Sequence, residues 1–89
     1  MKRIFKYKIS LNLGATTGLS IPKNGTILHA NIQMNELFIW VLVDTNEDTE
    51  MRYFQIYGTG HTINSVEKHL YIDTIFQDIF VWHLFERIN

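Results

Sequence analysis

Hydrophobic and polar residues alternate along most of this 89-residue chain. Successive side chains of a β-strand point to opposite faces, so a two-residue period indicates strands with one face in a core and the other in water. The pattern predicts seven strands and no long helix. It therefore favours an all-β fold, either a small antiparallel β-sandwich or an open barrel. The expected strands cover residues 5–9, 19–21, 27–33, 37–43, 51–57, 70–76 and 79–85.

Short polar segments separate these strands. Residues 22–25 have the composition of a tight turn, because proline presets one backbone angle and Asn-Gly accepts positive φ values. Residues 34–36 and 77–78 are expected to be hairpin connections, and the acidic residues 44–50 an exposed loop. The longest irregular connection follows residue 57, with one helical turn expected at residues 65–68.

Two of the expected strands, residues 37–43 and 79–85, are apolar on both faces. This pattern predicts that residues 37–43 form a central strand covered on both sides. The surplus apolar surface indicates either two covered faces or self-association, and we expect a homo-oligomer. In residues 27–33, alternation places Leu28, Ala30 and Ile32 on one face.

Size and composition restrict the class of protein. Residues 1–89 are enough for a single domain. Nine acidic residues balance eight basic ones, so neither nucleic acid nor an anionic membrane is the expected partner. The chain has no cysteine, which fits a reducing cytosol. Its charged first residues do not resemble a signal peptide, and no apolar run approaches about 18 residues. We expect a soluble cytoplasmic protein.

The segment Tyr57-Gly58-Thr59-Gly60-His61 ends an alternating run and is the most distinctive part of the chain. Glycine allows a sharp bend, and successive backbone N–H groups in a bend can form a small anion-binding concavity. Thr59 or His61 would add a side-chain donor. The segment lacks the ending of a P-loop and the spacing of a dinucleotide fingerprint. A purely structural turn is the alternative interpretation.

Aromatic residues near this segment extend the candidate site. Tyr53 and Tyr57 fall on the face opposite Phe54 and Ile56, so we expect both tyrosines to be open to a ligand, together with Arg52 or Arg87. Both tryptophans, Trp40 and Trp82, are expected in the core. The ligand-binding residues predicted from the sequence are Arg52, Tyr53, Tyr57, Gly58, Thr59, Gly60 and His61.

The patterns of metal sites and hydrolases are not found in this sequence. Its histidines, at positions 29, 61, 69 and 83, have no zinc-site spacing. They form no paired His-x-Thr/Ser repeats, and no serine lies at a nucleophile elbow. The carboxylates of residues 44–50 belong to a flexible loop, which holds a raised pKa poorly. We expect no enzymatic activity, no metal and no cofactor, with His83 a half-buried strand residue and His29 exposed.

Four segments, residues 39–44, 54–61, 71–77 and 80–86, resemble a family of small uncharacterised proteins found mostly in bacteriophages and prophages. In that family, a Trp-lined strand ending in Val-Asp precedes Ile-Tyr-Gly-Thr-Gly-His. A Tyr-Ile-x-Thr-Phe strand and a final His-x-Phe-Glu strand follow. Ile75 interrupts the Thr-Phe pair in this chain. The family carries no established enzymatic role, so the resemblance implies a phage accessory protein acting in the host bacterial cytoplasm.

These observations lead to a binding hypothesis. We expect a non-enzymatic counter-defence protein that sequesters a small anionic ligand, such as a cyclic or ADP-ribose-derived nucleotide, near residues 57–61. The alternative is an interaction module that inhibits or bridges a host or phage protein through a strand edge or the acidic loop. An enzyme is the third option.

Overall fold

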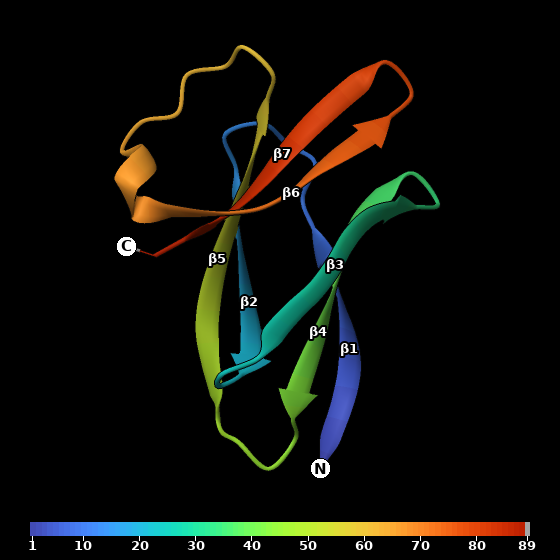
Figure 1. Cartoon of the computed structure of the whole chain (residues 1–89), viewed down its shortest axis with the longest axis vertical. Helices are drawn as coiled ribbons and strands as arrows, with labels where there is room; N and C mark the ends of the chain where they lie inside the picture. Colours follow the sequence, from blue (N-terminus) through green and yellow to red (C-terminus); the bar gives the residue numbers. More distant parts are fainter. Residues whose placement is uncertain (89) are drawn as a thin grey trace.

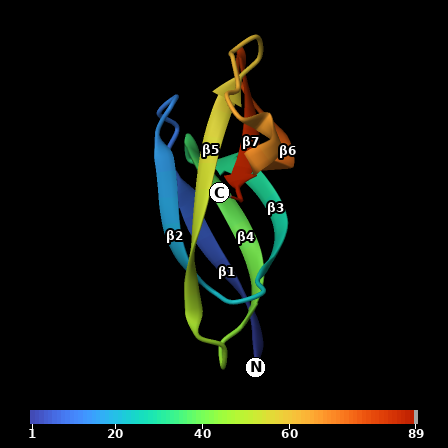
Figure 2. The same ribbon diagram turned by 90° about the vertical axis from the view of Figure 1, so that its left-hand side faces the viewer.

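The computed structural model describes residues 1–88 and shows an all-β fold, which confirms the prediction (Figure 1). Two antiparallel sheets face each other: a three-stranded sheet ordered β1-β4-β3 and a four-stranded sheet ordered β2-β5-β7-β6. In Figure 2, β2 and β5 of the larger sheet lie in front of β1 and β4 of the smaller one. The elements are β1 (Lys2–Ile9), β2 (Thr16–Pro22), β3 (Thr26–Gln33), β4 (Glu36–Asp44), β5 (Thr49–Gly58), the 3-10 turn η1 (Val66–Lys68), β6 (His69–Gln77) and β7 (Phe80–Arg87).

The tight turns, two of which close hairpins and one of which joins the two sheets, follow the predicted chemistry. Asn24 has a φ of 65°, and Met34 and Asn35 have φ values of 52° and 62°. Two successive positive φ values match the twist of a two-residue hairpin between antiparallel strands. Asp78 also has a positive φ, in the connection between β6 and β7. The tight connections predicted at residues 22–25, 34–36 and 77–78 are therefore confirmed.

The core lies between the two sheets and is built from alternate residues of each strand. In β4, every second residue from Leu37 to Val43 is buried, and Phe54 and Ile56 of β5 face them. Trp82 of β7 packs against this core while remaining half-buried. The fully or nearly buried apolar residues are Ile9, Ile21, Ala30, Leu37, Ile39, Val41, Val43, Phe54, Ile56, Ile75 and Leu84.

The expectation that residues 37–43 are covered on both sides is correct for one face only. Phe38 and Trp40 lie on the outer face of β4 and are half-buried, so the placement of Trp40 in the core is wrong. Side chains of the neighbouring strands shield them instead of a second layer. The Lys6 ammonium lies 4.1 Å from the centre of the Phe38 ring, and the His29 ring centre lies 5.9 Å from that of Trp40.

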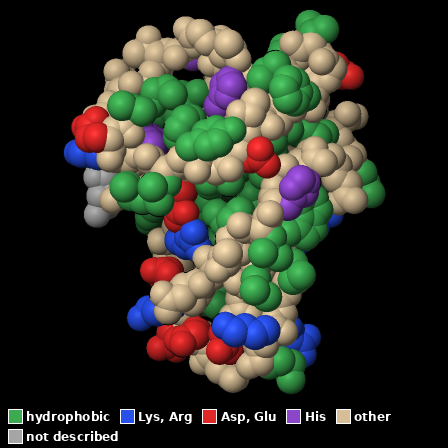
Figure 3. All heavy atoms as spheres, viewed as in Figure 1, with side chains coloured by type: hydrophobic (Ala, Val, Ile, Leu, Met, Phe, Trp, Pro, Cys, Tyr) green, Lys and Arg blue, Asp and Glu red, His purple; other side chains and the backbone are tan. Residues whose placement is uncertain are grey.

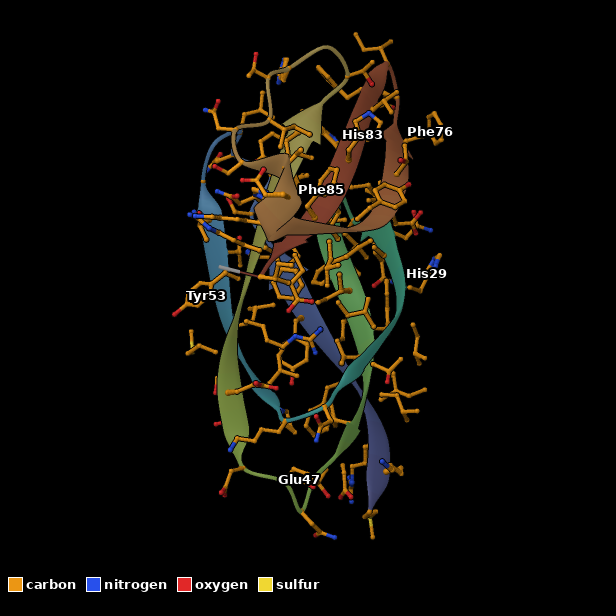
Figure 4. The ribbon with its side chains drawn as sticks, turned by 60° about the vertical axis from the view of Figure 1, so that its left-hand side comes forward. His29, Glu47, Tyr53, Phe76, His83 and Phe85 are labelled. Atoms are coloured by element: carbon orange, nitrogen blue, oxygen red, sulfur yellow. The ribbon has the colours of Figure 1, made fainter. Side chains whose placement is uncertain are left out.

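A β-bulge between Ile27 and His29 changes the facing of β3. The extra residue shifts the alternation by one position, so Ile27 and Ala30 face the core and Leu28 is exposed. The prediction that Leu28 shares a face with Ala30 is therefore wrong. His29 is exposed, as expected, and Figure 4 shows it pointing away from β3.

The end of β5 and the β6–β7 hairpin position the candidate site. Antiparallel pairing sets Tyr57 opposite His83 and Gly58 opposite Trp82. The connection from residue 59 to η1 and the hairpin tip both lie at the end of the molecule opposite the N-terminus (Figure 1). No helix within residues 1–88 is long and apolar enough to cross a membrane.

Candidate functional site

The bend that follows β5 depends on its second glycine, Gly60, more than on Gly58. The His61 N–H donates to the Gly58 carbonyl at 3.1 Å and closes a tight turn. Gly60 has a φ of +87°, a conformation that L side chains rarely adopt. At Gly58 an added Cβ would lie 2.9 Å from Cε1 of His61, so the exposed His61 ring would have to move away from its present position. We name residues 58–61 the glycine turn.

The glycine turn leaves several hydrogen-bond donors open. The Gly58 N–H donates to Nδ1 of His61 at 3.3 Å, so in the neutral ring the proton is on Nε2. Within residues 1–88, neither the Thr59 N–H nor the Gly60 N–H has a protein acceptor, and both residues are exposed. The predicted concavity therefore has two free amides and one imidazole N–H, while the Gly58 amide is already occupied.

A hollow of about 330 Å³ adjoins the glycine turn. Its lining includes the stacked pair Phe80 and Trp82, with ring centres 5.4 Å apart and planes 11° from parallel. The Trp82 indole N–H donates to Gln77 Oε1 at 3.1 Å, which fixes the ring. We name this cavity the Thr59 hollow. It is lined by Leu13, Gly58, Thr59, His61, Ile79, Phe80, Val81 and Trp82.

Side chains from β6 and β7 continue the polar network. His83 Nε2 lies 2.8 Å from Thr59 Oγ1, and His83 Nδ1 lies 3.0 Å from Thr74 Oγ1. Thr74 Oγ1 in turn lies 2.6 Å from the Tyr71 hydroxyl. His83 is half-buried and hydrogen-bonded, as the sequence predicts, and it lies on β7 (Figure 4). The Thr59 side chain is thus held by an imidazole.

Tyr57 lines a different hollow, of about 380 Å³, which shares no lining residue with the Thr59 hollow. Its hydroxyl donates to Gln55 Oε1 at 3.0 Å, and the same oxygen lies 2.9 Å from His69 Nε2. His69 Nδ1 lies 3.0 Å from the Ser65 carbonyl. Arg87 lines this hollow too and is exposed. Tyr57 is therefore part of a polar network beside the turn rather than a wall of the Thr59 hollow.

The structure does not bring Arg52 to the glycine turn. Its guanidinium donates to both carboxylate oxygens of Glu86, at 2.6 and 2.7 Å, and to the Gly25 carbonyl at 2.6 Å. The side chains of this ion pair are only 16% and 13% exposed. The hydrogen bond to Glu86 raises the pKa of Arg52 above its ordinary value. Arg52 faces the interior and joins two parts of the fold.

Tyr53 is exposed, as predicted, but it lies away from the glycine turn. Figure 4 shows it pointing outward from β5, where the register sets it opposite Arg87. Of the predicted residues, Gly58, Thr59, Gly60 and His61 form one turn, while Tyr57, Tyr53 and Arg52 lie elsewhere along β5.

Several residues that complete the site are absent from the set predicted from the sequence. Phe80 and Trp82 form the aromatic wall, and Tyr71 and Thr74 complete the hydrogen-bonded chain. One signal was present, since His83 is a polar residue inside an otherwise apolar strand. Its partners come from other strands, however, and no local pattern shows them. Within the described part of the chain, no group of three or more His, Cys, Asp or Glu residues could hold a metal ion.

The chain belongs to a protein family described as Domain of unknown function (DUF7352), whose model matches residues 1–89. No curated protein and no solved structure matches the chain.

Proposed function

We propose that this protein binds and sequesters a small anionic ligand that carries a flat ring, a nucleotide being the simplest molecule of this kind. The observation that carries the proposal is the pairing of unpartnered donors with an aromatic wall. Thr59 and His61 line the Thr59 hollow together with Phe80 and Trp82, and the open Gly60 amide belongs to the same turn.

The open donors support an anionic ligand. An exposed backbone N–H gains most from an acceptor that is charged, because charge-assisted hydrogen bonds are about twice as strong as neutral ones. The residues that line the Thr59 hollow include no Lys or Arg. Hydrogen bonds and stacking would therefore carry the affinity, with little contribution from ion pairs. We expect binding to depend only weakly on salt concentration.

The aromatic wall supports a flat ring. Phe80 is 51% exposed and lies parallel to Trp82, so one of its ring faces can be covered by a ligand. Stacking of a nucleobase on an aromatic side chain contributes about 1–3 kcal/mol. The hollow, at about 330 Å³, is at the lower end of the size range of small-molecule sites.

The resemblance to phage and prophage proteins supports a biological setting for such a site. A phage protein that sequesters a nucleotide signal of the host immune system would act in counter-defence in the host cytoplasm. Cyclic nucleotides and ADP-ribose derivatives combine a flat base with phosphate oxygens, which is the combination that the Thr59 hollow suits. The ligand would be held rather than converted.

Isothermal titration with a panel of mononucleotides, cyclic dinucleotides and ADP-ribose tests this proposal. We expect His61→Ala and Phe80→Ala each to weaken binding about tenfold, the equivalent of 1.4 kcal/mol. His29→Ala and Phe76→Ala are matched controls, since both residues are exposed and lie outside the hollow. The ligand should be recovered unchanged. Absence of heat across the panel at high micromolar concentration, or equal losses in the controls, would contradict the proposal.

One observation favours a second function, docking to a host or phage protein. Two hairpins expose large apolar side chains to solvent. At the β6–β7 hairpin, Ile79 is 89% exposed and Phe76 is 72% exposed, and at the β3–β4 hairpin Met34 is 88% exposed. Exposed apolar groups of this kind mark protein interfaces. Ile79→Asp should then abolish a stoichiometric complex, whereas Leu28→Asp, on a separate exposed strand position, should not. A homo-oligomer formed through the same tip would dissociate in the Ile79→Asp variant, as sedimentation would show.

A further inference from the structure

The side chains beside the Thr59 hollow form a directional hydrogen-bonded chain. Thr59 Oγ1 is 2.8 Å from His83 Nε2, and Thr74 Oγ1 is 3.0 Å from His83 Nδ1. A neutral imidazole has one donor and one acceptor nitrogen. When Nδ1–H donates to Thr74, the lone pair of Nε2 points at the Thr59 hydroxyl. Tyr71, 2.6 Å from Thr74 Oγ1, continues the chain, and either of these two hydroxyls can donate to the other while Thr74 Oγ1 accepts from Nδ1–H.

This arrangement has the parts of an activated nucleophile. A hydroxyl lies within hydrogen-bond reach of a base, and a third group orients the base. The Thr59 hydroxyl is exposed, whereas His83 and Thr74 are half-buried and held in the sheet. The backbone N–H groups of Thr59 and Gly60 have no protein acceptor within residues 1–88. One therefore belongs to the nucleophilic residue and the other to the residue that follows it. Amides at and after a nucleophile are suited to stabilise the oxyanion that its attack produces.

The Thr59 hollow defines the class of reactant. Phe80, Trp82, Leu13 and Ile79 give it apolar lining, and Thr59 lines the same hollow. An aryl or short alkyl ester would place its apolar group against this apolar lining and its carbonyl carbon near Thr59. We infer that Thr59 is an acyl acceptor, activated by His83, that takes the acyl group of small activated esters bound in the Thr59 hollow.

The acyl group is transferred in two steps. Thr59 Oγ1 attacks the ester carbonyl carbon while its proton moves to His83 Nε2, and the carbonyl oxygen becomes an oxyanion at the two amides. The bond from the carbonyl carbon to the alcohol oxygen then breaks, and His83 returns the proton to the leaving alcohol. The products are acyl-Thr59 and a free alcohol. Water can repeat the sequence, releasing the carboxylic acid and restoring the Thr59 hydroxyl.

This inference goes beyond the proposed function, because a nucleotide has no acyl ester to transfer. It shares with that proposal the accessibility of the glycine turn. The two remain distinguishable in the Thr59→Val variant, which removes the hydroxyl and keeps the shape and both amides. Nucleotide binding should persist in Thr59→Val, whereas acyl transfer should be lost.

The test uses p-nitrophenyl acetate with the full chain, following p-nitrophenol release and the acetylated residue by peptide mass spectrometry. We expect one acetyl group on Thr59 in the wild type and none at this position in Thr59→Val, with Thr59→Ser retaining the activity. His83→Gln should slow the release about 100-fold, the usual contribution of a general base. Thr62→Val, an exposed threonine in the same loop, and His29→Gln should leave the rate unchanged.

Thr74 acts through His83 and is a positioning residue, so Thr74→Val should lower the rate and Thr74→Ser should restore it. Circular dichroism of each variant separates loss of fold from loss of chemistry. If His83→Gln does not fold, the Thr59→Val and Thr74 pair still decide the outcome. Acetylation confined to lysine or histidine, or a rate in Thr59→Val equal to that of the wild type, would overturn the inference.

Discussion

Strand β5 carries a candidate binding group near each end, and the fold treats the two in opposite ways. Arg52, three residues into the strand, is engaged by both oxygens of Glu86 and by the Gly25 carbonyl. At the other end, Thr59 and Gly60 keep their backbone N–H groups free of any protein acceptor within residues 1–88. Figure 3 shows a related trend on the visible surface: charged side chains are densest at the lower end, while the upper half has more hydrophobic and histidine side chains among a few charged ones.

The difference separates structural polar groups from groups available to a ligand. Removing a charge from water costs free energy, so a charged side chain on the inner face of a sheet must be paired and hydrogen-bonded in the folded protein. Backbone donors in an exposed bend are solvated and need none. The polar residue with the strongest contacts, Arg52, is therefore the one least suited to bind a ligand, and the residues with the fewest contacts are the better candidates.

The largest expected effect is on stability, from the Arg52–Glu86 pair. Arg52→Met leaves the half-buried Glu86 carboxylate without its partner, which costs about 3–5 kcal/mol for a buried pair. The control is Lys8→Met, which breaks the exposed Lys8–Glu36 pair and should cost at most about 1 kcal/mol. Urea denaturation measures both. Equal losses in the two variants would contradict the structural role of Arg52.

A smaller loss is expected at the glycine turn, from backbone strain. Gly60→Ala forces a side chain into a left-handed conformation at φ +87°, with a cost of about 1–2 kcal/mol. Gly60→Asn should cost less than Gly60→Ala, because asparagine adopts positive φ values more readily than most residues other than glycine. Nothing lies within 4 Å of the added Cβ, so steric contact does not contribute. Denaturation midpoints in which alanine and asparagine are both as stable as glycine would show that the turn relaxes.

How far the sequence predicts this structure depends on the range of each interaction. Alternation is local, and it identified all seven strands, but it did not distinguish the buried face of β4 from the outer one, because residues 37–43 are apolar on both. The bulge at Leu28 depends on the pairing of β3 with β4, which no single strand encodes. Alternation also contained an unused signal for Arg52. It shares its face with the core residue Phe54, as Glu86 does with Leu84, so a charge pair between the strands could have been predicted.

In the candidate site, too, local sequence predicts some features, whereas others depend on how distant strands pair. The glycine turn is a contiguous segment, and its composition alone predicted a bend with open amides. The partners of Thr59 come from β6 and β7, and the aromatic wall comes from the β6–β7 hairpin. Their proximity results from strand order in the larger sheet, which places β7 between β5 and β6. Composition and spacing carry no information on this order.

At the exposed glycine turn, Thr59→Val should lower the free energy of unfolding only slightly. The lost hydrogen bond to His83 is exposed, so water can replace it, and the cost should be about 0.5–1 kcal/mol. Thr17 is the matched control, because its half-buried hydroxyl accepts from the Ser10 N–H at 3.0 Å. Thr17→Val leaves that amide unsatisfied, at about 1–3 kcal/mol. A larger loss in Thr59→Val than in Thr17→Val would place Thr59 among the structural groups.

The smallest effect is expected at Asp44, in the charged end of the molecule. Its carboxylate accepts from the Asn46 N–H and from the N-terminal ammonium, each at 3.0 Å, and these contacts lower its pKa below the ordinary 3.8. A lowered pKa in the folded state contributes stability that is complete above the ordinary value and is lost as pH falls through the folded value. Urea midpoints should therefore fall slightly more in the wild type than in Asp44→Asn between about pH 5 and pH 2. Because Asp44 is at the surface, high salt should remove most of this difference. Parallel pH profiles at low salt would mean that the contact does not persist in solution.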